Sequence, residues 1–156
     1  MESKSVGRSV LEGLGILSVV LSLAFVAFQI KQSTDQARAT MSYDISMSFG
    51  AYHDLIAGDA ELAGIRARLR EPEPEFTDQE RERAFSLAMR LFNAWMSVHR
   101  AHLAGVISSD QYESYRVEVE ATVARLPGAI PLWSEFLEAR PHLYEVPLLA
   151  PLRPFR

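Results

Sequence analysis

The stretch GLGILSVVLSLAFVAFQI begins at Gly13 and ends at Ile30; it holds no charged side chain, and Gln29 is its only strongly polar one. At a rise of about 1.5 Å per residue these residues form a helix of about 27 Å, close to the ~30 Å hydrocarbon thickness of a bilayer. Glu12 and Lys31 bound the stretch. A helix satisfies its own backbone hydrogen bonds where no water is present. The stretch therefore predicts a transmembrane helix.

Three other interpretations of this stretch compete with a membrane span. A cleaved signal peptide could use Lys4 and Arg8 as its charged region and Ala-Arg-Ala at 37–39 as its cleavage site, but that site follows Lys31 and Asp35, and the apolar segment is too long. A core helix of a soluble protein usually has a polar face, which this stretch lacks. A helix lying in the plane of the membrane surface needs a strongly polar face.

Small residues inside the predicted span share one side of the helix. Gly15, Ser18 and Ser22 follow one another at spacings of three and four. Small residues let transmembrane helices approach closely, so this stripe is a possible helix-packing face for self-association. Gly and Ser are also common in spans that do not associate, and the sequence leaves that alternative open.

Composition limits the classes of function. The chain has 156 residues, a net charge of −4, 48% hydrophobic residues and no cysteine. The absence of cysteine excludes disulfides, thiolate metal sites and cysteine nucleophiles. No basic stripe with interleaved aromatic residues is present, so we expect no nucleic-acid partner. Lys4 and Arg8 before the span balance Lys31 and Arg38 after it, and the positive-inside rule gives no orientation.

The pattern after the span predicts an all-α chain: a polar lead-in at 1–12, the transmembrane helix at 13–30, a helical domain at 31–140 and a Pro-rich tail at 141–156. Helices are expected at 31–58, 59–70, 77–104, 108–126 and 131–139. The 77–104 helix has the broadest apolar face and should be central to the domain. Its expected inward residues are Phe85, Ala88, Leu91, Phe92, Trp95, Val98, His102 and Leu103.

Local signals place the helix ends. Thr77 with Glu80, and Ser108 with Gln111, match the capping box at a helix start. Gly58 and Gly105 suit helix C-termini, and Pro127-Gly128 stops the fourth helix. The Glu-Pro-Glu-Pro-Glu segment at 71–75 is expected to be an exposed linker. The four prolines after residue 140 exclude a regular α-helix there and predict an extended strap or a mobile segment.

The run LSLAFVAFQIKQST at 21–34 ends in a motif of the form Q-[IL]-[RK]-Q-[NS]-T. It resembles the end of the membrane span in a family of small, uncharacterised bacterial membrane-anchored helical proteins. The segment DAEL at 59–62 looks like the family's D-P-E-L, GVI at 105–107 like its G-L-L turn, and Pro127-Gly128 before Trp133 like its P-G-x-x-x-W-W. The resemblance extends to about residue 144. It implies a single-pass anchor with a helical domain, and no activity.

This chain departs from the family pattern at three positions. Members often carry a Glu and a Gln along the central helix, where this chain has Met96 and Ala101, and Leu132 stands in place of the first Trp. A function that needed the polar pair would be missing here. If the pair was structural, this helix face has been repacked with apolar side chains.

Histidines are the only candidates for metal chemistry. His99 and His102 are three residues apart on the central helix, and His53 lies on the first. Helical metal sites usually add a carboxylate in Glu-x-x-His, and this sequence contains none. It also has no G-x-S-x-G, no P-loop and no dinucleotide fingerprint. We therefore assign no catalytic, cofactor-binding or metal residues and expect no cofactor.

The sequence supports three hypotheses of function. The first is a non-enzymatic module, anchored in the bacterial inner membrane, that binds membrane lipid through its span and another membrane protein or itself. The second is a small-molecule binder with an apolar pocket among the central, fourth and fifth helices. The third is a metal-dependent enzyme using His53, His99 and His102. Nothing in the sequence demands export, which favours a cytoplasmic domain.

Overall fold

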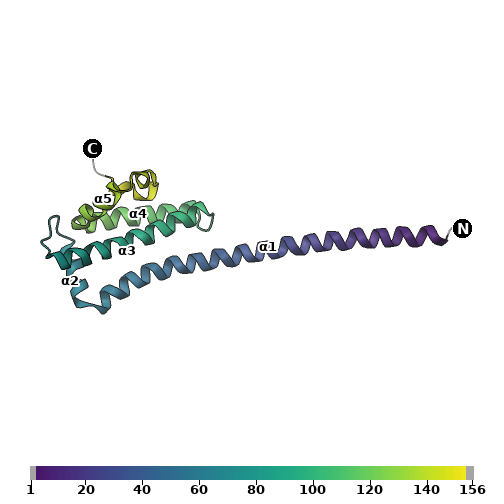
Figure 1. Ribbon diagram of the computed structural model, residues 1–156, viewed down its shortest axis with the longest axis horizontal. Coiled ribbons are helices and arrows are strands. Elements are labelled where there is room, and N and C mark those ends of the chain that lie inside the picture. The colour runs from purple at the N-terminus through teal and green to yellow at the C-terminus, as the bar shows by residue number, and fades with distance from the viewer. Residues whose placement is uncertain (1–2, 154–156) are drawn as a thin grey trace. The chain divides into compact units, whose positions relative to one another are not determined.

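The computed structural model describes the backbone of residues 3–153 and the side chains of residues 13–153. Every regular element in this part of the chain is helical, which confirms the predicted all-α class (Figure 1). The α-helices and the shorter 3₁₀ helices are α1 Ser3–Gly58, α2 Ala60–Arg68, α3 Asp78–Leu103, α4 Ser109–Arg125, η1 Pro127–Ala129, α5 Ile130–Glu138, η2 Pro141–Glu145 and η3 Pro147–Leu152.

The chain divides into two units at residues 40 and 41, within α1. The first unit consists of the N-terminal part of α1, which already begins at Ser3 in the predicted lead-in. All of its side chains from residue 13 to residue 40 are exposed. The apolar run therefore does not form the buried core helix of a soluble domain within the described residues.

The last part of α1 belongs to the second unit. Ile45 and Tyr52 are buried there, and the Phe49 ring stacks on Tyr115 of α4 with centroids 5.9 Å apart. These three residues of α1 follow one another at spacings of four and three, which keeps them on one side of the helix. The helix ends at Gly58, as expected, and the Asp59 carboxylate then accepts backbone hydrogen bonds at the start of α2.

Helix α3 is the centre of the second unit and packs against α2, α4 and α5 (Figure 1). Its predicted capping box is present, with Thr77 and Glu80 exchanging hydrogen bonds. Trp95 on its buried face lies 5.3 Å from the Trp133 ring of α5, centroid to centroid. The inward placement of Leu103 was wrong: its side chain is 73% exposed, because it lies at the end of α3 beyond the packed helices.

The turn between α3 and α4 follows the predicted signals. Gly105 has a φ of +66°, a left-handed conformation that glycine adopts without steric cost. Ser108 and Gln111 then form the second capping box. Because this turn is short, α4 folds back along α3 and brings Tyr112 beside the last turns of α3.

The acidic linker is anchored more firmly than its composition suggested. The Gly128 N–H donates to the Leu69 carbonyl at 3.0 Å. A Cβ added at Gly128 would overlap the Glu71 carbonyl oxygen and lie 2.8 and 2.9 Å from ring carbons of Pro74. The glutamates of the linker are exposed, as expected, but its backbone and Pro74 pack directly on the Pro-Gly turn.

The C-terminal tail is not an extended strap. In its described part, which ends at residue 153, Pro141 and Pro147 begin η2 and η3, two consecutive 3₁₀ helices. Leu148, Leu149 and Leu152 are buried, and η3 packs along α4. The prediction that prolines exclude an α-helix is confirmed, whereas burial of three leucines makes this segment part of the core.

Candidate functional site

The apolar part of α1 is the most distinctive surface of the chain. The helix is long and apolar enough to cross a membrane, with a mean hydropathy of 2.2 over its most apolar 18 residues and none of that window buried. Leu21, Leu23, Phe25 and Phe28 are each more than 60% exposed. Exposed apolar patches larger than a few hundred Å² are rare on soluble monomers, so this surface needs a lipid or protein environment.

The predicted helix-packing residues lie on this exposed part of α1. A Cβ added at Gly15 would meet no other atom within 4 Å, so a neighbouring helix could approach its backbone. The Ser22 hydroxyl donates to the Ser18 carbonyl at 2.8 Å. The Ser22 hydroxyl thus satisfies its hydrogen bonding within its own helix and does not need a partner for it.

His99 and His102 share one partner, Tyr112 at the start of α4. The Nδ1 atom of His99 lies 2.9 Å from the Tyr112 hydroxyl, and the His102 ring stacks on the Tyr112 ring at 4.2 Å between centroids. Burial, with a smaller effect of His102, lowers the pKa of His99, which favours a neutral imidazole. Burial likewise raises the pKa of the Tyr112 hydroxyl. This arrangement packs the helix hairpin.

Tyr112 was not singled out as a histidine partner from the sequence. The signal that could have found it is the short turn at Gly105, because two helices joined by so few residues must pair near the turn. The cluster brings two imidazoles and a neutral phenol together. Among the described residues, no carboxylate hydrogen-bonds to any of these three side chains.

His53 contacts a different aromatic ring from His99 and His102. Its side chain is exposed on the second-unit part of α1 and meets the edge of the Tyr52 ring, with centroids 5.4 Å apart. Within residues 13–153, no three His, Cys, Asp or Glu side chains form a group that could hold a metal ion. The geometry therefore gives no support to the hypothesis of a metal-dependent enzyme using His53, His99 and His102.

A groove of the second unit lies between α4, α5 and the C-terminal turns and has a volume of about 740 Å³. Most of its lining surface is apolar, and two arginines and one glutamate lie among its lining residues. These are Arg116, Glu120, Val123, Ala124, Pro127, Ile130, Ser134, Ala150, Pro151 and Arg153. The sequence placed an apolar pocket among the central, fourth and fifth helices. The structure has α4 and α5 at the groove, with η3 in place of α3.

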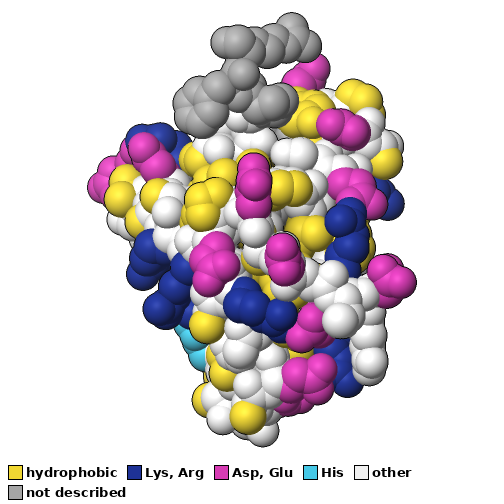
Figure 2. Space-filling view, turned by 90° about the vertical axis from the view of Figure 1, so that its left-hand side faces the viewer, with side chains coloured by type: hydrophobic (Ala, Val, Ile, Leu, Met, Phe, Trp, Pro, Cys, Tyr) yellow, Lys and Arg dark blue, Asp and Glu magenta, His cyan; other side chains and the backbone are white. Residues whose placement is uncertain are grey.

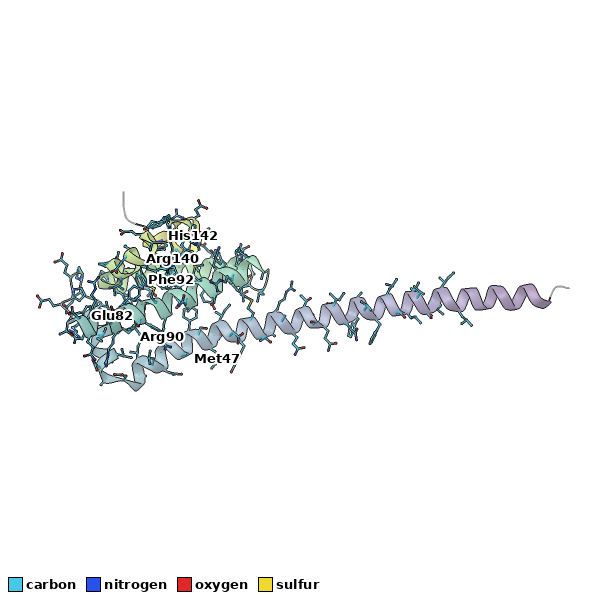
Figure 3. All side chains as sticks on the ribbon, in the orientation of Figure 1. Met47, Glu82, Arg90, Phe92, Arg140 and His142 are labelled. Carbon is cyan, nitrogen blue, oxygen red and sulfur yellow. The ribbon has the colours of Figure 1, made fainter. Side chains whose placement is uncertain are left out.

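Two smaller grooves meet at Arg90 on α3, which Figure 3 labels. One has a volume of about 310 Å³ and lies toward α2, and the other, of about 270 Å³, lies toward the second-unit part of α1. Serine, asparagine, arginine and glutamate side chains line them among a few apolar residues.

Two ion pairs connect α2 with α3. Arg68 donates to Glu80 at 2.5 Å and lies over the Phe76 ring, and Arg83 of α3 pairs with Glu61. Hydrogen bonds from Arg68 and from the Thr77 backbone lower the pKa of Glu80 to about 2. Figure 2 shows acidic and basic side chains interspersed over one face, without a patch of one sign. Comparison with models of protein families, with curated proteins and with solved structures gives no match for this chain.

Proposed function

We propose that this chain is a single-pass protein of the bacterial inner membrane, held by residues 13–30, whose helical unit binds another membrane protein or a second copy of the chain. The observation that carries the proposal is the fully exposed, uncharged helix surface at 13–30. Burying an apolar side chain contributes about 1.5–3 kcal/mol, so insertion of this many apolar residues outweighs any single polar contact. Gln29, the one strongly polar residue, lies beside the Lys31 boundary.

An interaction role fits the second unit better than catalysis does. Its clearest local features, the two capping boxes and the Pro-Gly turn, all act in holding helices together. The side chains that the sequence offered for chemistry, His99 and His102, pack on Tyr112. The resemblance to bacterial membrane-anchored helical proteins agrees with this proposal and adds no activity to it.

Fractionation of lysed cells tests the anchor. We expect the full-length protein in the membrane pellet after ultracentrifugation, and in the supernatant only with detergent. Two arginines at the centre of a span cost about 5–7 kcal/mol, so Val20→Arg with Ala24→Arg should remove the protein from the pellet. The matched control adds two arginines to the same helix outside the span, Ser42→Arg with Ser46→Arg, and should remain in the pellet.

The anchor is refuted if the unmodified protein stays in the supernatant without detergent. Intact mass of the purified protein separates a span from a cleaved leader, because cleavage after residue 39 would remove the span. A single cysteine at the exposed Ser109 reports orientation, since the chain has no other cysteine. For a cytoplasmic domain, an impermeant maleimide should label spheroplasts only after permeabilisation.

Purification from detergent extract tests the interaction role. We expect a partner protein or a species larger than one copy in size-exclusion chromatography with light scattering. Repeated isolation of a monomer without any partner, across mild detergents, would refute an interaction module.

A binder of small apolar molecules is a second candidate, and the 740 Å³ groove favours it. Ligand pockets of about 300–1,000 Å³ with few polar groups are typical of drug-sized ligands. Arg153 at the groove suits a carboxylate head, whereas Arg116 is already paired with Glu113. Straight-chain carboxylates of increasing length should raise the melting temperature of the protein but not of Ala124→Trp, which fills the groove. If none of these carboxylates raises the melting temperature of the protein, the result counts against a small-molecule binder.

A further inference from the structure

Tyr112 is the point where three elements of the second unit meet. The residue lies at the start of α4 and is buried, and its hydroxyl lies 2.9 Å from Nδ1 of His99 on α3. Burial raises the pKa of this hydroxyl, and the Leu148 backbone of η3 acts on it in the opposite direction. A backbone group that lowers the pKa of a phenol presents its N–H, because a donor stabilises the phenolate. Tyr112 thus connects α3 with the C-terminal tail.

The hydrogens at this site fit one direction of bonding. Because the Leu148 N–H points at the phenol oxygen, the Tyr112 hydroxyl donates its own hydrogen to Nδ1 of His99. A neutral imidazole with its proton on Nε2 accepts this hydrogen, whereas an imidazolium carries hydrogens on both nitrogens and cannot accept. Protonation of His99 would therefore leave the hydroxyl hydrogen of a buried side chain without its acceptor, which is unfavourable.

No negative charge compensates an imidazolium at this site. His102 is the titratable neighbour of His99 on α3, and its charge disfavours a second cation there. Within residues 13–153, no carboxylate forms an ion pair with either imidazole, and Glu113, next to Tyr112, pairs with Arg116. The other charged and histidine side chains on nearby parts of α1, α3, α4 and the tail are exposed: Asp44, His53, Asp54, Arg100, Asp110, His142, Glu145 and Arg153.

The tail segment that touches Tyr112 also forms one side of the 740 Å³ groove. Helix η3 packs along α4, with Leu148 at the Tyr112 end. Its following residues Ala150 and Pro151 line the groove together with residues from the later turns of α4. A change that loosens η3 at Tyr112 therefore also loosens the tail side of the groove.

We propose that protonation of His99 releases η3 from the start of α4 and opens the tail side of the groove, so that the second unit responds to acid. Burial, with a smaller effect of His102, lowers the pKa of His99 from 6.5 while the tail is closed, so the open state gains stability as pH falls below 6.5. An imidazole with its ordinary pKa is about 90% protonated at pH 5.5, which favours the open state by up to about tenfold over pH 7.5. This inference concerns the second unit alone and depends on neither the membrane anchor nor a ligand in the groove.

Amide hydrogen exchange of the full-length protein in detergent, followed by mass spectrometry at pH 7.5 and 5.5, tests the release. After correction for the intrinsic pH dependence of exchange, the amides at 148–152 should lose up to about tenfold in protection at pH 5.5, and those of α2 should not. In His99→Gln the amide oxygen accepts the Tyr112 hydrogen without titrating, so tail protection should be equal at both pH values. His142→Gln is the matched control: it removes an exposed histidine of the tail itself, labelled in Figure 3, and should keep the wild-type pH dependence.

Three outcomes would overturn the release of the tail. The first is a wild-type tail with the same protection at both pH values, which needs no variant. The second is a pH dependence that persists in His99→Gln, because another group would then be responsible. The third is an equal loss of protection in every helix, which indicates destabilisation of the whole unit. Circular dichroism at 222 nm checks that each variant is folded at pH 7.5; if His99→Gln is not, Tyr112→Phe, which lacks the hydroxyl, should likewise abolish the pH dependence of tail protection.

Discussion

Gly128 is the position where one methyl group should matter most. Its N–H donates to the Leu69 carbonyl at 3.0 Å, and an added Cβ would overlap the Glu71 carbonyl oxygen. Backbone cannot rotate away as the end of a flexible side chain can, so Gly128→Ala must shift the acidic linker or the Pro-Gly turn. Overpacking of this kind costs about 1–3 kcal/mol. The entropy that alanine removes from the unfolded chain offsets at most about 1 kcal/mol of that cost.

Gly64 is the matched control for this change. It lies inside α2, and a Cβ added there would meet no atom within 4 Å. Alanine is favoured over glycine inside a helix by about 1 kcal/mol, so Gly64→Ala should stabilise the protein. The two glycine-to-alanine changes are chemically identical but should have opposite signs, separated by about 2–3 kcal/mol in the free energy of unfolding.

Thermal unfolding of the full-length protein in detergent, followed by circular dichroism at 222 nm, measures both variants. For a unit of about this size, 1 kcal/mol corresponds to roughly 4 °C, so Gly128→Ala should melt several degrees below the wild type and Gly64→Ala a few degrees above. Pro74→Ala in the Gly128→Ala background should restore only part of the loss, because the Glu71 carbonyl remains. A Gly128→Ala protein that melts at or above the wild-type temperature would refute the close contact.

Three further changes test the caps and the titrating groups. Thr77→Ala removes the capping box of α3 and should cost about 1 kcal/mol in chemical denaturation. The pKa of Glu80 in the folded protein, about 2, lies below its ordinary value of 4.5. Its pairing with Arg68 therefore stabilises the fold above about pH 4.5, and this stabilisation is lost as pH falls through 2. Glu80→Gln should melt at a lower temperature than the wild type at neutral pH, and most of this difference should be gone at pH 2. The pKa of His99 in the folded protein is lowered from 6.5, so the unfolded chain takes up a proton at this residue first, and the stability of the fold should decrease as pH drops below 6.5. His99→Gln should therefore make the melting temperature less dependent on pH below 6.5. A melting profile of His99→Gln that matches the wild type would contradict this reasoning.

Local signals were enough for most helix boundaries. Capping boxes at Thr77 and Ser108 depend on groups three residues apart, and the helix stop at Gly105 depends on one backbone conformation. The apolar run at 13–30 depends on its own composition. Each of these features has its cause within a few residues, so the sequence alone predicts it.

Contacts between distant segments were not predictable in the same way. Tyr112 meets His99 and His102 only because α4 folds back on α3, and the tail is buried only because α4 offers a surface for Leu148, Leu149 and Leu152. The groove beside the tail depends on the same packing, which is why the sequence placed the central helix there instead of η3.

By itself, the sequence determined an all-α chain with one exposed apolar helix long enough for a bilayer, because hydrophobicity, caps and prolines act locally along the chain. Only the tertiary structure decided that Gly128 must lack a side chain, that Leu103 is outside the core and that the Pro-rich tail is inside it. Those outcomes depend on which surfaces meet across the fold, and burial is a property of the neighbours that a residue acquires after the helices have packed.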